Sequence, residues 1–61
     1  MAQVTITYEG GKTREVGYYY DGGAKLAAED VVRMRYSGVT RVTCTDSRGR
    51  VIIAQPISCG G

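Results

Sequence analysis

Apolar and polar residues alternate with a period of two near both ends of the chain and follow a helical period between them. In residues 3–9, valine, isoleucine and tyrosine alternate with threonine, which is the pattern of a half-buried strand. The pair Gly10 and Gly11 then supplies the positive φ that a tight hairpin turn needs. These residues therefore predict a strand followed by a reversal of the chain.

The run Thr13–Tyr20 predicts a second strand, antiparallel to the first. Its alternation directs Tyr18 and Tyr20 toward the core and Tyr19 toward solvent. Gly17 within the run indicates a β-bulge or the close approach of another group. One exposed tyrosine is therefore expected among three consecutive ones.

The segment Asp21–Gly38 has the helical period. Its apolar residues gather on one side, as a stripe that would cover the sheet; they are Ala24, Ala27, Ala28, Val31 and Met34. Asp21 is expected to cap the start of the helix, and Gly38 is expected to end it in the left-handed conformation. On the opposite side, Glu29 and Arg33 have the spacing of a favourable ion pair.

The stretch Val39–Thr45 predicts a third strand, with Val42 and Cys44 directed inward. Residues 46–49, DSRG, place Asp first and Gly last, which is the preference of a type I turn. The fourth predicted strand, Arg50–Gln55, is apolar at successive positions and therefore on both faces. We expect it to be central in the sheet or partly covered.

These elements make one α+β domain over residues 1–61, in the order ββαββ, with one helix packed on a four-stranded antiparallel sheet. Pro56 ends the last strand, and residues 57–61 are expected to form a flexible tail. A chain of 61 residues buries about 60% of the surface that it exposes when unfolded. The core must therefore be a thin layer between helix and sheet.

The composition excludes several classes of function. With no histidine and two cysteines, the chain lacks zinc-ligand spacing and the commonest general base, so we expect no enzyme, metal or cofactor. Cys44 is expected to be a small buried hydrophobe, with a Cys44–Cys59 disulfide as the alternative. The longest apolar run, Val51–Ala54, is far too short to span a membrane, and the first residues do not resemble a signal peptide. We therefore expect a cytoplasmic protein without a membrane partner.

Basic residues and one tyrosine are the surface features that predict binding, with a solvated mixed-charge surface as the alternative. The net charge of +2 is well below that of a dedicated nucleic-acid domain. Tyrosine beside arginine is nevertheless the composition of protein-binding hot spots and of base-stacking surfaces, and Tyr19 is expected near Arg41 on the solvent face. The candidate partner-binding residues are Tyr19, Lys25, Arg33, Arg35, Arg41 and Arg48.

The end of the chain, Gly60 and Gly61 after a ββα start, resembles the β-grasp sulfur carriers of thiamine and molybdopterin synthesis. The resemblance implies a terminal glycine that is adenylated and then thiocarboxylated. It covers the last two residues and the coarse order of elements. The chain departs from this family because few residues follow the helix, which leaves little room for the long crossover and the strand that pairs with the first.

A second resemblance covers more of the chain. The segment AKLAAEDVVRMRYSGVTRVTCTDSRGRVIIA, a helix with alanine and basic positions followed by a G-V-x-x-V hairpin, resembles small phage-encoded proteins, among them single-helix, β-sheet anti-CRISPR inhibitors of type I systems. It implies a non-enzymatic protein that binds a surveillance complex in the host cytoplasm through basic residues. The matching positions are Lys25, Arg33 and Arg35 on the helix, with Arg41 and Arg48 nearby.

The leading hypothesis is a small binding module that inhibits a larger protein or nucleoprotein partner. A sulfur carrier is the alternative from another class, and nucleic-acid binding by the sheet face is a third hypothesis. An exposed strand edge could also pair with its twin to form a homodimer. The charge reversals Arg33→Glu and Arg41→Glu are expected to abolish partner binding while the fold persists.

Overall fold

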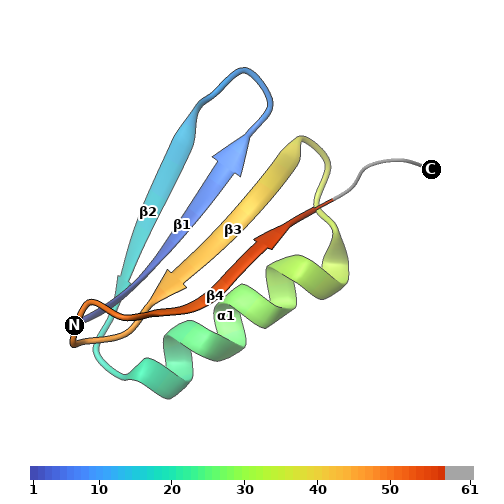
Figure 1. Ribbon diagram of the computed structural model, residues 1–61. Coiled ribbons are helices and arrows are strands. Elements are labelled where there is room, and N and C mark those ends of the chain that lie inside the picture. Colours follow the sequence, from blue (N-terminus) through green and yellow to red (C-terminus); the bar gives the residue numbers. More distant parts are fainter. Residues whose placement is uncertain (58–61) are drawn as a thin grey trace.

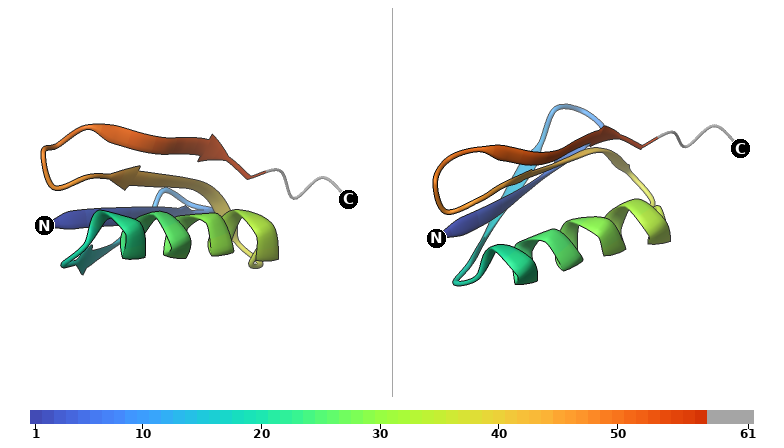
Figure 2. Two further views of the ribbon diagram at one scale, coloured as in Figure 1. Left: turned by 90° about the horizontal axis from the view of Figure 1, so that it is seen from below. Right: turned by 60° about the horizontal axis from the view of Figure 1, so that its bottom comes forward.

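The computed structural model describes residues 1–57 and confirms the predicted α+β fold in the order ββαββ. Four antiparallel strands form one sheet in the order β2-β1-β3-β4, and α1 crosses one of its faces (Figure 1). Within the described residues the other face of the sheet is open, which is seen best edge-on (Figure 2). The elements are β1 (Ala2–Tyr8), β2 (Thr13–Tyr18), α1 (Asp21–Met34), β3 (Val39–Thr45) and β4 (Val51–Pro56).

The core lies between α1 and the sheet and consists mainly of small and β-branched residues. Val4 of β1 pairs with Val16 of β2 on one side and with Cys44 of β3 on the other, so these side chains share one face. The buried residues are Ala2, Val4, Ala24, Ala28, Val31, Val39, Val42, Cys44 and Ile57. Because Ala24 and Ala28 are small, α1 can lie close to the sheet.

The connection between β2 and α1 differs from the prediction. β2 ends at Tyr18, and Tyr20 is 80% exposed, so the expectation of a buried Tyr20 is wrong. Tyr20 is also the N-cap residue of α1 and makes no side-chain cap bond. Asp21 is the first residue of the helix and not its cap, and its carboxylate accepts hydrogen bonds from Ser47 of the second hairpin.

The end of α1 also differs from the prediction. The helix stops at Met34, and Arg35 takes the left-handed conformation, with φ of 51°, that was expected of Gly38. The N–H of Arg35 donates to the carbonyl of Val31 at 3.0 Å and completes the last turn. Gly38, with φ of 85°, serves the turn into β3 instead. Met34 is 57% exposed, so this last residue of the predicted apolar stripe does not reach the core, whereas Val31 does.

β4 is an edge strand, so the first of the two expectations, a central strand, is wrong, and the second, a partly covered strand, holds because Ile53 packs against the core. Val51 is 60% exposed and Ile52 is 44% exposed. A register shift places these two residues opposite Thr45 alone, which is a β-bulge. Two apolar faces indicated burial on both sides, but no local pattern encodes the order of strands in a sheet.

Ile57 belongs to the core, so the tail predicted over residues 57–61 is wrong at its first residue. Its side chain is 8% exposed, and its N–H donates to the carbonyl of Thr40 at 2.9 Å. The backbone therefore continues the pairing with β3 beyond Pro56. The remaining predicted tail, with Cys59 and the terminal glycines, lies outside the described residues.

The predicted turns are confirmed. The glycines at 10–11 have φ of 89° and 87°, and in the second hairpin the N–H of Gly49 donates to the carbonyl of Asp46 at 3.0 Å. Gly17 marks a close approach and not a bulge, because a Cβ there would lie 3.3 Å from the terminal methyl carbon of Met1. These features fix the registers that place the surface residues.

Candidate functional site

Three of the predicted binding residues gather at one end of the molecule. Tyr19 lies in the connection between β2 and α1, and Arg48 lies in the turn between β3 and β4; both connections are at the lower left of Figure 1. Lys25 follows one helical turn after Asp21, the first residue of α1. With Tyr20, these residues form what we call the Tyr–Arg end: Tyr19, Tyr20, Lys25 and Arg48.

Hydrogen bonds to two carboxylates hold the Tyr–Arg end together. The backbone N–H of Ser47 donates to Oδ1 of Asp21 at 2.9 Å, and the Ser47 hydroxyl donates to Oδ2 at 3.4 Å. Within the turn, Oδ1 of Asp46 accepts the N–H of Arg48 at 2.9 Å and that of Arg50 at 2.8 Å. The backbone that carries Arg48 is therefore fixed to the start of α1, while its side chain remains exposed.

The two tyrosines at this end are unusually exposed. Tyr19 is 85% exposed and Tyr20 is 80% exposed, although tyrosine is intermediate in burial between the core and the surface residue types. Sequence reasoning found Tyr19 and missed Tyr20. The signal that could have found it is the Asp-Gly-Gly that follows, since a helix start directly after Tyr20 removes it from the strand alternation.

The cations at the other end of α1 have a different environment. Nη2 of Arg33 lies 3.1 Å from Oδ1 of Asp30, and the Tyr36 hydroxyl donates to Oδ2 of Asp30 at 3.3 Å. The predicted Glu29–Arg33 pair is therefore replaced by a pair with Asp30. Arg35 closes the helix from its left-handed position.

Arg41 lies far from Tyr19, so their predicted proximity is wrong. Arg41 pairs with Thr7 at one end of β1. Tyr19 follows Tyr18, which pairs with Ala2 at the opposite end of β1. Because strands rise about 3.3 Å per residue, the length of the strand separates them.

The open face of the sheet is lined mainly by threonines. The residues that alternate with the core positions are Thr5, Thr7, Thr13, Thr43 and Thr45, with Gln3, Glu15 and Arg41 among them. Tyr8 and Tyr18 pack on the core side. The aromatic rings on which a sheet could stack bases are therefore turned toward α1 or placed at the ends of the molecule.

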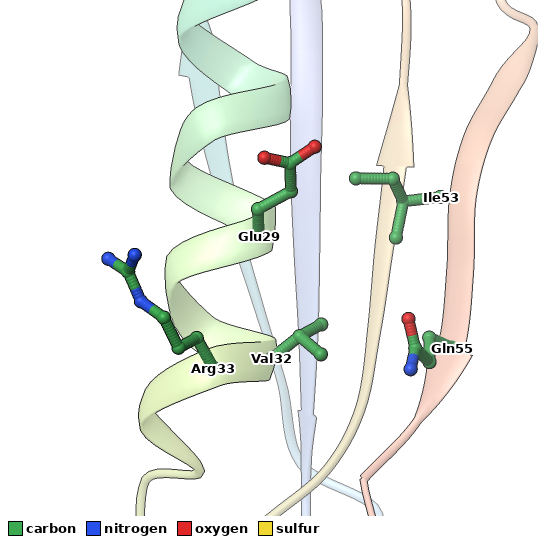
Figure 3. A pocket seen from close by; sticks show the side chains of 5 residues that line it. All are labelled: Glu29, Val32, Arg33, Ile53 and Gln55. Carbon is green, nitrogen blue, oxygen red and sulfur yellow. The ribbon is translucent and has the colours of Figure 1, made fainter.

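A groove between α1 and β4 was not foreseen from the sequence. It has a volume of about 250 Å³ and is lined by Glu29, Val32, Arg33, Ile53 and Gln55. Val32 and Glu29 project from α1, and Ile53 and Gln55 line the β4 side (Figure 3). The groove exists because α1 lies over the inner strands and Ile53 is too short to fill the space beside it.

Burial raises the pKa of the Cys44 thiol, and the nearby charges of Asp21 and Asp46 raise it further, so this thiol is a poor nucleophile. Within residues 1–57, no three histidine, cysteine, aspartate or glutamate side chains gather closely enough to hold a metal ion. No helix in this part of the chain has both the length and the apolar character needed to cross a bilayer.

No protein-family model, curated protein or solved structure matches this chain.

Proposed function

We propose that this chain is a small non-enzymatic binding module, an inhibitor of the kind that the anti-CRISPR resemblance implies, and that it binds its partner through the Tyr–Arg end. The observation that carries the proposal is the exposure of Tyr19 and Tyr20, at 85% and 80%, beside Arg48. Tyrosine and arginine are the residues most enriched in binding hot spots. The tyrosines are available to a partner because they take no part in the core.

Pre-organisation supports this assignment. The bonds from Ser47 to Asp21 and from Arg48 to Asp46 fix the backbone of the Tyr–Arg end before a partner arrives. A tyrosine has two rotatable side-chain bonds and loses little entropy when it is buried at an interface. Binding there would therefore cost less ordering than binding through a mobile loop.

The charges of this end favour an acidic protein surface as the partner. Lys25, Arg48 and the adjacent Arg50 are exposed cations. Asp21 and Asp46 lie among them, but their carboxylates already accept backbone N–H groups. A partner that presents carboxylates to the cations and an apolar surface to the tyrosine rings would match this end.

The test is capture from host lysate with purified wild-type and variant chains, the bound proteins identified by mass spectrometry. Tyr19→Ala with Tyr20→Ala, and separately Arg48→Glu, should each reduce capture of the specific partner at least about tenfold. Arg41→Glu, which the sequence alone predicted to abolish binding, is here the matched control. Arg41 lies on the open face at the other end of β1 from Tyr19, so the same charge change there should leave capture unchanged. Equal loss in all three variants would show a non-specific charge effect, and no loss in any would refute the Tyr–Arg end.

Two further arms separate the alternative functions. Digestion of the lysate with nuclease, and a salt series, should leave capture of a protein partner largely intact, whereas capture through a phosphate backbone would fall steeply with salt. Deletion of Gly60 and Gly61 should have no effect. Loss of an adenylating enzyme from the captured set after that deletion would support the sulfur carrier and contradict the binding module.

A further inference from the structure

Among the described residues, the outer edge of β4 has a short segment of backbone whose N–H and carbonyl groups have no partner strand. The N–H of Ile57 donates to the carbonyl of Thr40, so the antiparallel pairing with β3 uses every second residue of the outer strand, including Gln55 and Ile53. Ala54, which lies between them, therefore directs both its N–H and its carbonyl outward. The bulge at residues 51–52 and Pro56, which has no N–H, bound this segment on its two sides.

The side chains around this segment leave apolar surface to bury. Val51 and Ile52 are 60% and 44% exposed on β4. On the α1 side, the groove with Val32 and Ile53 on its walls opens beside the same edge. A strand with free backbone groups and apolar side chains is the kind of edge that pairs with another chain.

A second copy of the chain fits this edge because the edge complements itself. A two-fold axis at Ala54 would let the two Ala54 residues exchange N–H···O=C bonds in an antiparallel pair. It would set Ile53 of one copy opposite Gln55 of the other. The β4 sides of the two grooves would then lie next to each other along the new strand pair. Of the two charged residues that line the groove, Glu29 extends over it, whereas the Arg33 guanidinium turns away from β4 and pairs with Asp30 (Figure 3), so backbone pairing and apolar contact have to carry the association.

We propose that two copies associate along β4 into one eight-stranded sheet, with the two-fold axis at Ala54. The groove between α1 and β4 then becomes part of an enlarged core. The dimer would therefore add buried surface to a chain of 61 residues, which on its own buries only about 60% of the surface that it exposes when unfolded. The dimer does not depend on the Tyr–Arg end, which lies at the end of the sheet and stays exposed.

Sedimentation velocity of the purified chain, from about 10 μM to about 1 mM, tests the proposal. Ala54→Pro removes an N–H that the single copy does not use, so the fold should persist while the dimer dissociation constant rises at least about tenfold. The matched control is Glu15→Pro on β2. Its N–H also faces outward, because Tyr8 and Lys12 form a bonded pair in the same register. Glu15→Pro should leave the dissociation constant within about twofold of the wild-type value.

A wild-type chain that stays monomeric throughout this range overturns the proposal, as does an equal effect of the two prolines. If Ala54→Pro fails to fold, a charge at the axis decides. Ala54 is exposed, so Ala54→Lys should be tolerated by the single copy, but it would set two like charges against each other across the new strand pair and should raise the dissociation constant at least about tenfold. An unchanged dissociation constant would contradict the two-fold arrangement.

Discussion

The two edge strands of the sheet, β2 and β4, are protected against uncontrolled pairing in different ways. β2 keeps an unbroken register with β1, but its side chains include the charged Arg14 and Glu15, both exposed. β4 has apolar side chains, but its backbone is interrupted by the bulge and by Pro56. Charged side chains thus disfavour pairing at the β2 edge, and the bulge and Pro56 limit pairing at the β4 edge. The comparison teaches that β4 alone combines an apolar surface with a short, defined segment for pairing.

The packing of α1 differs on the same two sides. Toward β2, the ring of Tyr18 lies close enough to α1 that a Cβ on Gly23 would be 3.8 Å from it, so the space is closed. Toward β4, Val32 and Ile53 leave the groove of about 250 Å³. A large side chain against a glycine closes one flank, and two shorter aliphatic side chains leave the other open.

The largest expected effect on stability comes from a proline at a β4 residue whose N–H is hydrogen-bonded to β3. Gln55→Pro removes an N–H that is directed to β3 and leaves a carbonyl of β3 without its donor. It should lower the free energy of unfolding by about 2–3 kcal/mol. Ala54→Pro, one residue away, should cost less than about 1 kcal/mol, because its N–H faces outward. Urea unfolding measures both, and equal losses would contradict the assignment of inward and outward residues.

Truncation of the two flank residues should give unequal effects, the larger of them no greater than that of Gln55→Pro. Tyr18→Ala opens the closed flank and should cost about 2–3 kcal/mol, because it removes a ring packed between α1 and β2. Ile53→Ala enlarges a groove that is already open to solvent and should cost about 1–2 kcal/mol. Thermal or urea unfolding of dilute samples gives these values for the single copy. A larger loss for Ile53→Ala would mean that the β4 flank is the better packed of the two.

The free energy of unfolding is expected to depend on pH through Cys44, which lies in the core next to β4. Cys44 pairs with Ile53, and burial, then Asp21, then Asp46 raise the pKa of its thiol above the ordinary value of 9.0. The pKa of Cys44 is higher in the folded than in the unfolded state. Its contribution to the free energy of unfolding is therefore fully present below the unfolded pKa and is lost as the pH rises through the folded pKa. The free energy of unfolding should therefore decrease as the pH is raised above about 9. Cys44→Ala should flatten this slope; an unchanged slope would assign it to other groups.

The smallest expected effect on stability comes from the exposed apolar residues of β4. Ile52→Thr should change the free energy of unfolding of the single copy by less than about 0.5 kcal/mol, since the side chain is 44% exposed on an edge. The same change should weaken association at high concentration. Glu15→Thr on β2 is the matched control and should leave association unchanged. Sedimentation velocity of both variants, read beside their urea unfolding curves, separates the two effects.

The sequence predicted those parts of the fold that local patterns encode. Strict alternation placed β1 and β3, with Val42 and Cys44 inward, and turn chemistry placed both hairpins. The error at Gly38 arose because Arg35 accepts a left-handed conformation that glycine adopts more easily. The error at Asp21 arose because a partner from the far hairpin, Ser47, competes for the capping carboxylate.

The candidate sites were harder to predict than the fold. Residue types alone identified Tyr19 and Arg48, but the end at which they meet depends on how two connections distant in sequence come together. The groove beside Val32 and Ile53 depends on strand order, which decides whether the apolar β4 is central or at an edge. Properties of this kind arise from tertiary packing, and no periodicity in a single strand or helix contains them.

The most direct test of the difference between the edges is amide hydrogen exchange by NMR at low and high protein concentration. Both Ala54 and Glu15 direct their N–H groups outward from the sheet, so in the single copy both should exchange rapidly. Pairing along β4 predicts that Ala54 becomes protected as concentration rises, while Glu15 remains unprotected. Equal exchange of the two amides at every concentration, or protection of Glu15 alone, would contradict the account.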